Sequence, residues 1–320
     1  MHDGRAQTRR ARPLPPLSTF FPAAPERGRP GDPGLFGPGS AAWRIGRERV
    51  LLASGPAALL LQVAHPLVAA GVAAHSDFAG DPLTRLRGTL DAVLTVTFGD
   101  STQVRDAARH VARRHRVVQG TLPVATGSLP AGTPYRAADR DLALWVFATL
   151  VWTSVVVTDG FARPVPGAER DAYYRDMRRV AHHFGVPDAA LPDDYAALER
   201  YVDEQVEHVL AVGPTAARLA AQILSPDPPL VAVPARPLPS LLAAGVLPAA
   251  VRDAYGLPWR QRERLAFRAA QLATRRALPL LPARPRYWPH YLVATDRLQP
   301  VGVPAQPVPT DDGQPGDVRT

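Results

Sequence analysis

Apolar residues recur every three or four positions over most of the chain, which is the spacing of an α-helix with a buried face. Proline, aspartate, serine or glycine stands at nearly every boundary of these stretches, where such residues start or end helices. The helical segments predicted in this way are 40–54, 56–75, 82–99, 101–120, 139–158, 166–184, 192–212, 214–224, 238–255 and 258–278. Breaks are expected at Pro66 and near Pro248, because proline removes a backbone donor and crowds the preceding turn. No stretch alternates convincingly like a β-strand, so the pattern predicts an all-α fold in a single large multi-helix domain.

The two ends of the chain differ from this helical region. Residues 1–39 are rich in proline, glycine and arginine, and they predict an irregular arm with Phe20, Phe21 and Phe36 as its anchors. Residues 299–320 are polar and proline-rich, and we expect a disordered tail there. The helical domain is therefore placed at residues 40–298.

The absence of cysteine limits the chemistry. It excludes disulfides, iron–sulfur clusters, thiolate-bound haem and thiol catalysis. A tightly held metal would have to use histidine or carboxylate ligands. The formal charge of +8 is spread along the chain without an aromatic or recognition-helix context, so it does not predict nucleic-acid binding.

Two long apolar stretches bear on location. The stretch from Leu51 to Ala74 carries no formal charge, and the run from Leu142 to Val157 is apolar but short for a membrane span. Helices that are apolar all round also form the centre of a large helical domain, which is the interpretation we favour. The N-terminus has no apolar segment typical of a secretory signal. We therefore expect a cytoplasmic protein without a transmembrane segment, and leave peripheral membrane contact open.

A histidine stands on an otherwise apolar helix face in segment 101–120. Val104, Ala108, Val111, His115 and Val118 recur at alternating steps of four and three, which places them on one face. An imidazole buried on that face needs a partner for its ring nitrogens, because an unpaired buried polar group costs about 1–3 kcal/mol. The partner can be a protein group, as in an ordinary core histidine, or a metal.

A second stripe lies on segment 82–99. Arg85 and Thr89 are four residues apart, so their side chains meet, and Gly88, Ala92 and Val96 leave room beside them. An arginine and a hydroxyl above small residues suit a flat ligand whose rim carries carboxylates, because arginine holds a carboxylate with two hydrogen bonds. The alternative is an ordinary, partly exposed helix edge.

Together the two segments resemble the catalytic domain of the rubber-oxygenase family, which includes latex clearing protein and MpaB-type oxygenases. The pattern Arg85-x-x-x-Thr89 is followed, about one helix later, by the run from His115 to Gly120. Further stretches similar to motifs of this family are Leu59–Pro66, Val72–Ser76, Tyr135–Asp139, Leu144–Thr149, Phe184–Pro187, Leu247–Pro248 and Tyr255–Leu257. The resemblance covers roughly residues 40–295.

The resemblance implies a helical fold with a globin-like core that holds haem b. It implies that His115 is the proximal iron ligand and that Arg85 and Thr89 lie in the haem pocket. Characterised members use O2 to cleave a carbon–carbon double bond of an isoprenoid chain. The residues expected to form the apolar walls of the pocket are Val93, Val96, Val111 and Val118.

Two departures from the family pattern matter for mechanism. Some rubber oxygenases carry a lysine three residues after the arginine, where it can occupy the distal iron position; this chain has Gly88 there. We therefore predict an open or water-ligated distal site, unless His65 or His75 reaches it. The stretch Leu67–Ala70, where the family places a catalytic carboxylate, is apolar.

The sequence thus predicts a haem b-dependent oxygenase that uses O2 to oxidise a hydrophobic small molecule, such as an isoprenoid, or to cleave its C=C bond. The alternative is a non-catalytic haem-binding or lipid-binding helical protein of the same fold. A purely structural protein would require His115 to be a core histidine.

Overall fold

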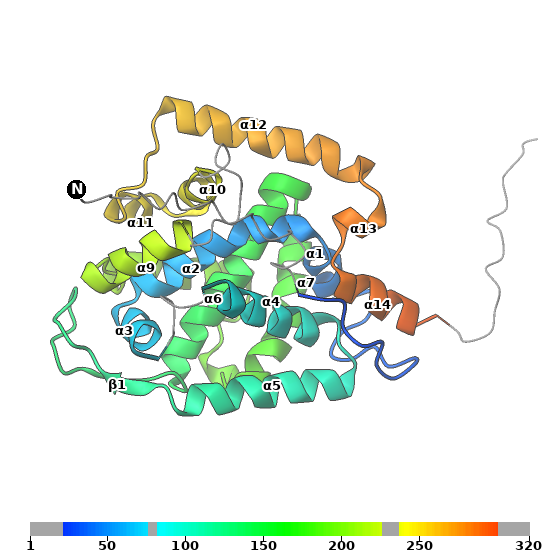
Figure 1. The fold of residues 1–320 in the computed structure, drawn as a ribbon, viewed down its shortest axis with the longest axis horizontal. Helices are drawn as coiled ribbons and strands as arrows, with labels where there is room; N and C mark the ends of the chain where they lie inside the picture. Colours follow the sequence, from blue (N-terminus) through cyan, green and yellow to red (C-terminus); the bar gives the residue numbers. More distant parts are fainter. Residues whose placement is uncertain (1–21, 76–81, 226–236, 300–320) are drawn as a thin grey trace, which may run out of the picture.

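The computed structural model describes residues 22–75, 82–225 and 237–299, with the backbone alone for 82–86. Within these residues the chain forms fourteen α-helices and two short β-strands (Figure 1), so the predicted all-α class is confirmed. The α-helices are α1 (Ala41–Gly46), α2 (Gly55–Ala64), α3 (Pro66–His75), α4 (Pro82–Phe98), α5 (Ser101–Arg116), α6 (Arg140–Val157), α7 (Gly167–His183), α8 (Tyr195–His208), α9 (Pro214–Leu224), α10 (Leu238–Val246), α11 (Ala249–Ala254), α12 (Gln261–Ala277), α13 (Ala283–Arg286) and α14 (Pro289–Arg297). Short helical turns are η2 (Arg49–Ser54), η3 (Thr158–Ala162), η4 (Asp188–Ala190) and η6 (Leu278–Leu280).

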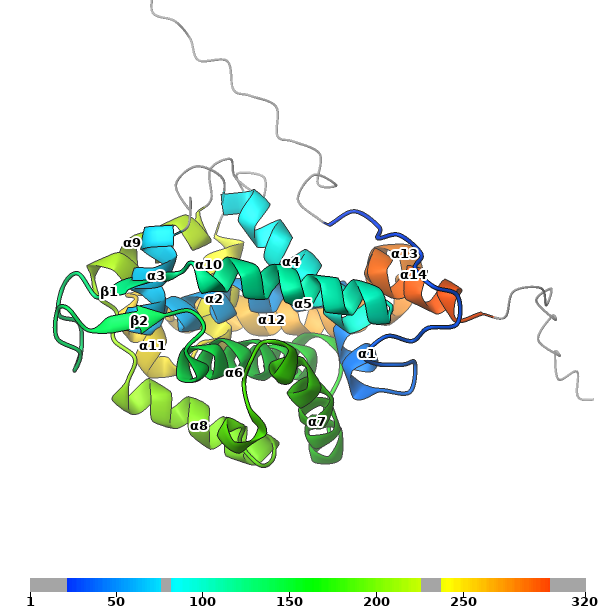
Figure 2. The same ribbon diagram turned by 90° about the horizontal axis from the view of Figure 1, so that it is seen from below.

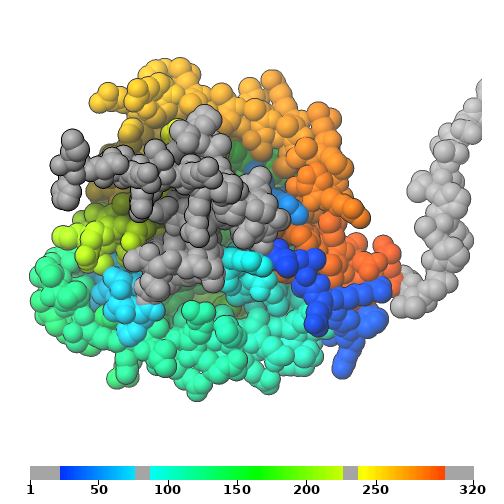
Figure 3. Space-filling model, viewed as in Figure 1, coloured from blue at the N-terminus to red at the C-terminus, as the bar shows by residue number. Residues whose placement is uncertain are grey.

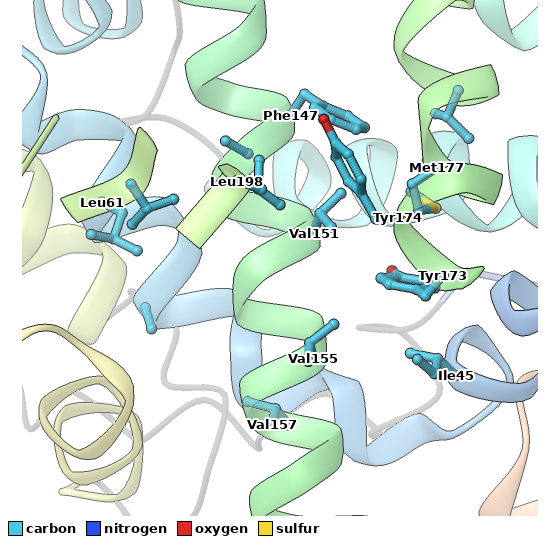
Figure 4. Packing of buried hydrophobic residues seen from close by; sticks show 14 of the residues in the cluster. Ile45, Leu61, Phe147, Val151, Val155, Val157, Tyr173, Tyr174, Met177 and Leu198 are labelled. Atoms are coloured by element: carbon cyan, nitrogen blue, oxygen red, sulfur yellow. The ribbon is translucent and has the colours of Figure 1, made fainter. Parts of the chain in front are cut away.

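Helix α6 is the central element of the core. Trp145, Ala148, Val151 and Val155 along it are almost completely buried. Figure 4 shows residues of α6 packed among side chains of the helices around it, which include Ile45, Leu61, Tyr173, Tyr174, Met177 and Leu198. The burial of α6 on all sides explains why its sequence is apolar without a polar face.

By length and composition, the stretch Arg140–Ala162 could also cross a membrane. More than half of its most apolar window, 56%, is buried inside the protein. Its polar groups are also satisfied internally: the Thr153 hydroxyl donates to the Thr149 carbonyl at 2.7 Å, and the Trp145 indole donates to the Leu61 carbonyl at 3.2 Å. This is the arrangement of a core helix.

The predicted break at Pro66 is confirmed. The stretch Arg49–Ala64 and helix α3 meet at 104°. His65 stands between them in an extended conformation, with φ −76° and ψ 119°, which is the region that a following proline imposes. The break near Pro248 is also confirmed, because α10 ends at Val246 and α11 begins at Ala249.

Two details of the predicted helix in segment 101–120 were wrong. Ser101, at the start of that segment, is the cap that the sequence predicts, because serine is favoured at this position. Asp100 caps the helix instead: its carboxylate accepts from the Thr102 and Gln103 amides, and the Gln103 side chain accepts from the Asp100 amide. The helix ends at Arg116, and the chain then forms β1 (Gln119–Thr121), which pairs antiparallel with β2 (Pro134–Arg136). Strands of three residues are too short for their alternation to be visible in the sequence.

The described part of the N-terminal arm contains no helix before α1, and it is fixed to the domain. Phe36 is buried in the main core, whereas Phe20 and Phe21 lie outside the described residues. Arg297 of α14 is almost fully buried and donates from Nε to the Asp32 carbonyl and from Nη2 to the Phe98 carbonyl, each at 2.8 Å. These contacts tie the arm, the end of α4 and the end of α14 together. The predicted tail from residue 300 onward lies outside the described residues.

Candidate functional site

Helices α4 and α5 form an antiparallel hairpin joined by Gly99 and Asp100 (Figure 2). The helices diverge from this joint toward the start of α4 and the end of α5 (Figure 2). Arg85 and Thr89 near the start of α4 and His115 in the last turn of α5 therefore both lie at the open end of the hairpin, away from the joint.

Burial falls along this hairpin from its joined end to its open end. At the joined end Val96 and Val104 are buried, and Ala108 is buried one turn further along α5. Toward the open end Val111 is half-buried and Thr89 is exposed. The open end of the hairpin is thus its accessible part.

The prediction that His115 points into the core was wrong, because its side chain is exposed. The apolar face of α5 is covered where α4 packs against its first turns, but His115 lies in the last turn, beyond that cover. Helical spacing fixes the face on which a residue lies, and only the neighbouring elements decide how far along the helix that face is buried. His115 therefore does not need an internal partner to offset burial.

Arg85 and Thr89, the polar residues expected in the pocket, lie in the first turns of α4. Thr89 is exposed, and the Arg85 side chain lies outside the described residues. A methyl group added at Gly88, between them, would meet open space. The first two turns of α4 thus present a hydroxyl beside an uncrowded strip of backbone.

The four valines predicted as pocket walls do not share one environment. Val96 belongs to the main core rather than to a pocket. Val118 packs against α3 and β2, where a methyl group added at Gly71 would lie 3.6 Å from Val118 and 3.4 Å from Tyr135. Val93 and Val111 are both half-buried, but Val93 lies near the joined end of α4, so only Val111 offers apolar surface toward the open end of the hairpin.

His65 is buried and caps the start of α3. Its Nδ1 accepts a hydrogen bond from the Leu67 amide at 3.3 Å. Burial lowers the pKa of His65 to about 4, so its ring is neutral at pH 7. The residue that was a candidate for the distal pocket thus has a structural role at the bend.

His75, the other distal candidate, is exposed at the end of α3. Its Nε2–H donates to the Gln119 carbonyl at 2.9 Å, and its ring meets Tyr135 edge-on with 6.4 Å between centroids. This contact links α3 to β1, just after the end of α5. His75 therefore lies on the same side of the domain as the open end of the hairpin.

A buried histidine that the sequence reasoning missed is His290 on α14. Its Nε2–H donates to the Asp91 carboxylate of α4 at 3.2 Å, whereas its Nδ1 has no hydrogen-bond partner. Burial lowers its pKa. The pair Trp288-Pro289 could have revealed the start of this helix, because proline is favoured in the first helical turn.

Among the described residues, no group of three or more histidine, aspartate or glutamate side chains lies close enough together to hold a metal ion. A site built only from protein ligands is therefore not found in that part of the chain. Iron in a porphyrin needs only one or two protein ligands, so a single histidine is sufficient for that kind of centre.

Comparison with known proteins identifies the family of this domain. Residues 42–276 match the family model described as ER-bound oxygenase mpaB/B'/rubber oxygenase, catalytic domain. The chain belongs to this family. The matched region contains the α4–α5 hairpin with Arg85, Thr89 and His115, and it confirms the resemblance seen in the sequence motifs.

Two mycobacterial relatives cover the same region. The uncharacterized proteins Mb2261 of Mycobacterium bovis and Rv2237 of Mycobacterium tuberculosis are each 30% identical to this chain over 239 residues. The alignments cover 72% of this chain and 89% of each relative. No solved structure matches the chain.

The residues at the open end of the hairpin fit a haem in three respects. His115 offers an exposed imidazole, the backbone at Gly88 is uncrowded, and Val111 offers half-buried apolar surface. Val96 and Val118 do not take part, because they are packed within the protein. A site for this cofactor would therefore be smaller than the sequence predicted and confined to this end.

Proposed function

We propose that this protein is a haem b-dependent oxygenase that uses O2 to oxidise an unsaturated hydrophobic molecule or to cleave its C=C bond. The observation that carries the proposal is the family match over residues 42–276. The α4–α5 hairpin supports it, because its open end carries the histidine, the arginine and the threonine that match the family motif.

Each of these residues has a separate role in the proposal. The His115 imidazole would hold the iron, and Arg85 would bind a propionate or stabilise oxygen through a charge-assisted hydrogen bond. The Thr89 hydroxyl, exposed one turn after Arg85, can donate or accept a hydrogen bond at the same edge. Haem with a histidine ligand supplies the capacity to bind and activate O2.

The half-buried Val111, toward the end of α5, would exclude water and contact the substrate. A hydrophobic chain lying against it would gain about 25 cal/mol for each Å² of apolar surface buried. Helix α3 carries no acidic residue, so it offers no counterpart of the family's carboxylate base. A proton acceptor in the reaction would have to come from another element or from the substrate.

The missing base is the observation that favours a second candidate, a haem-binding or lipid-binding protein without turnover. A haem-binding protein of this kind would need the same haem contacts but no proton acceptor, and a lipid-binding protein would need neither. The second candidate therefore differs from the first in the consumption of O2, and its lipid-binding form differs also in the absence of haem.

The experiment begins with the absorption spectrum of the protein produced with a haem precursor, before and after dithionite and CO. We expect a Soret band that moves on CO binding, because the sixth position would be open. A colourless protein that also fails to take up added hemin would overturn the haem proposal. O2-dependent formation of carbonyl products from an unsaturated isoprenoid hydrocarbon would separate the oxygenase from the non-catalytic candidate.

Two histidine variants test the ligand. His115→Ala should lose haem while keeping its helical circular dichroism. His110→Ala is the matched control, because His110 is also exposed on α5 but lies on its polar face. Full haem occupancy in His115→Ala would refute the ligand assignment, and equal loss in both variants would show only that α5 had been disturbed.

A further inference from the structure

Helix α12 lies along one edge of the molecule, at the top of Figure 1 and Figure 3. Phe267 fixes it to the domain: its ring packs edge-on against Phe161 at 5.3 Å and Trp259 at 5.5 Å between centroids. The chain then continues through η6 to α13 on the same edge. The helix is therefore held by its inner face, and its outer face is left to the surroundings.

The outer face of α12 and the turn after it expose large apolar side chains. Leu265 is 56% exposed and Leu272 is 50% exposed. They are seven residues apart, which is two turns of the same face and about 10 Å along the helix. After the helix, Leu280 is 83% exposed and Leu281 is 42% exposed. The contact of these four exposed leucines with water is unfavourable, and a partner that covered this stretch would remove it.

The same stretch is strongly basic. Residues 260–286 contain eight arginines and a single acid, Glu263, which gives a formal net charge of +7. Arg286 is paired with the buried Glu48 at 2.9 Å, and Arg262 is paired with Glu263 at 2.5 Å. Within the described part of the chain, the arginines of this stretch without an acidic partner include Arg264, Arg268, Arg276 and Arg284.

A groove of about 380 Å³ opens on the side of this helix. Its apolar lining is Trp259 and Phe267, and its polar lining is Arg252, Arg264, Arg268 and Gln271. Arg252 stacks over the Trp259 ring at 5.2 Å. The lining contains three positive charges and no acid, so the groove suits an anionic group attached to an apolar body.

We propose that the outer face of α12 and the turn that follows it dock the protein on an anionic membrane. In this arrangement α12 lies in the plane of the interface, as amphipathic helices with arginines on their polar flanks do. Leu265, Leu272, Leu280 and Leu281 enter the boundary between headgroups and acyl chains. Arg264 and Arg268 bind lipid phosphates, and the groove beside them takes one headgroup.

The leucines decide the class of partner. A nucleic acid would neutralise the arginines, but it would leave the four exposed leucines in contact with phosphates and water. An anionic bilayer satisfies the positive charges and the apolar side chains of one face at the same time. The proposal does not depend on the proposed oxygenase activity.

Flotation of the full-length protein with vesicles tests this proposal. We expect binding to phosphatidylcholine vesicles that contain phosphatidylglycerol, and weak binding to phosphatidylcholine alone. Arg264→Glu with Arg268→Glu should weaken binding by about tenfold or more at low salt, because each arginine near an anionic surface contributes substantially to affinity. Arg200→Glu with Arg218→Glu is the matched control: these arginines are exposed on α8 and α9, and the change of net charge is the same.

The absence of cysteine allows a direct test of insertion. Leu272→Cys labelled with an environment-sensitive fluorophore should brighten when anionic vesicles are added. Val124→Cys, labelled at an exposed valine in the loop between β1 and β2, should not.

Several outcomes would overturn the proposal. These are equal brightening at both labelled positions, equal loss of binding in both charge-reversed proteins, and binding to a DNA duplex without binding to vesicles. Loss of vesicle binding in the α12 variant together with an unchanged haem spectrum would support the docking surface and leave the oxygenase question separate.

Discussion

Replacing His65 by asparagine should make the stability of the protein less sensitive to acid. His65 is only 7% exposed, and burial lowers its pKa from 6.5 to about 4. Its Nδ1 accepts from the Leu67 amide at the start of α3, a bond that the protonated ring cannot accept. A positive charge would also meet the positive end of the α3 dipole. Asparagine is a good helix cap and provides an oxygen acceptor that does not titrate.

The size of the effect follows from the two pKa values. Between about pH 6.5 and pH 4 the unfolded chain binds a proton at this position and the folded chain does not, so the free energy of unfolding falls as the pH is lowered. The full loss below both values is about 3 kcal/mol, and the loss at about pH 5 is about 2 kcal/mol. Above the unfolded value this contribution is fully retained.

Urea unfolding followed by circular dichroism at about pH 8 and about pH 5 measures this effect. The wild type should lose about 2 kcal/mol more than His65→Asn over this interval. His110→Asn, a change at an exposed histidine of α5, should follow the wild type. Parallel pH profiles for the wild type and His65→Asn would refute the argument that a buried neutral imidazole caps α3.

Three further predictions concern the stability of the folded domain. Gly245→Ala should lower the free energy of unfolding by about 1–3 kcal/mol, because its methyl group would lie 2.2 Å from the Phe267 ring; Gly167→Ala, where a methyl group meets open space, should not destabilise the protein, and thermal melts compare the two. Asp100→Ala should cost about 1–2 kcal/mol in urea unfolding, because it removes the cap of α5, and an unchanged midpoint would contradict that role. Glu48→Gln should lower the free energy of unfolding by about 3 kcal/mol. The reason is that the Arg286 guanidinium of α13, which donates to the Glu48 carboxylate at 2.9 and 3.0 Å, would lose its buried counter-charge. Equal stability would show that the pair is effectively solvated.

The sequence was sufficient for the helices with clear ends. Pro66 and Pro248 mark real breaks, and α4, α6 and α9 begin and end within about two residues of the predicted positions, which is the usual uncertainty of helix ends. Proline and glycine act through the local backbone, so their effect does not depend on distant contacts. The family motifs are also local, and they were sufficient to identify the family of the domain.

The environment of the candidate site could not be predicted in the same way. The apolar stripe of α5 correctly placed Val104 and Ala108 in the core, but it failed at His115, because α4 covers only the first part of that face. Val96 and Val118 share the helical or near-helical spacing of the pocket residues, yet each packs against a different partner. Spacing gives direction around a helix and contains no information about where a neighbouring helix diverges from it.

The amino-acid sequence by itself determined the helical class, the break at His65-Pro66 and the family, because these depend on backbone chemistry and on short motifs. Only the tertiary structure decided that α4 and α5 diverge from their joint, that His115 is exposed at the open end, and that the leucines of α12 face outward. Each of these depends on contacts between residues distant in the chain. Burial is a property of the assembled neighbours rather than of the residue that is buried.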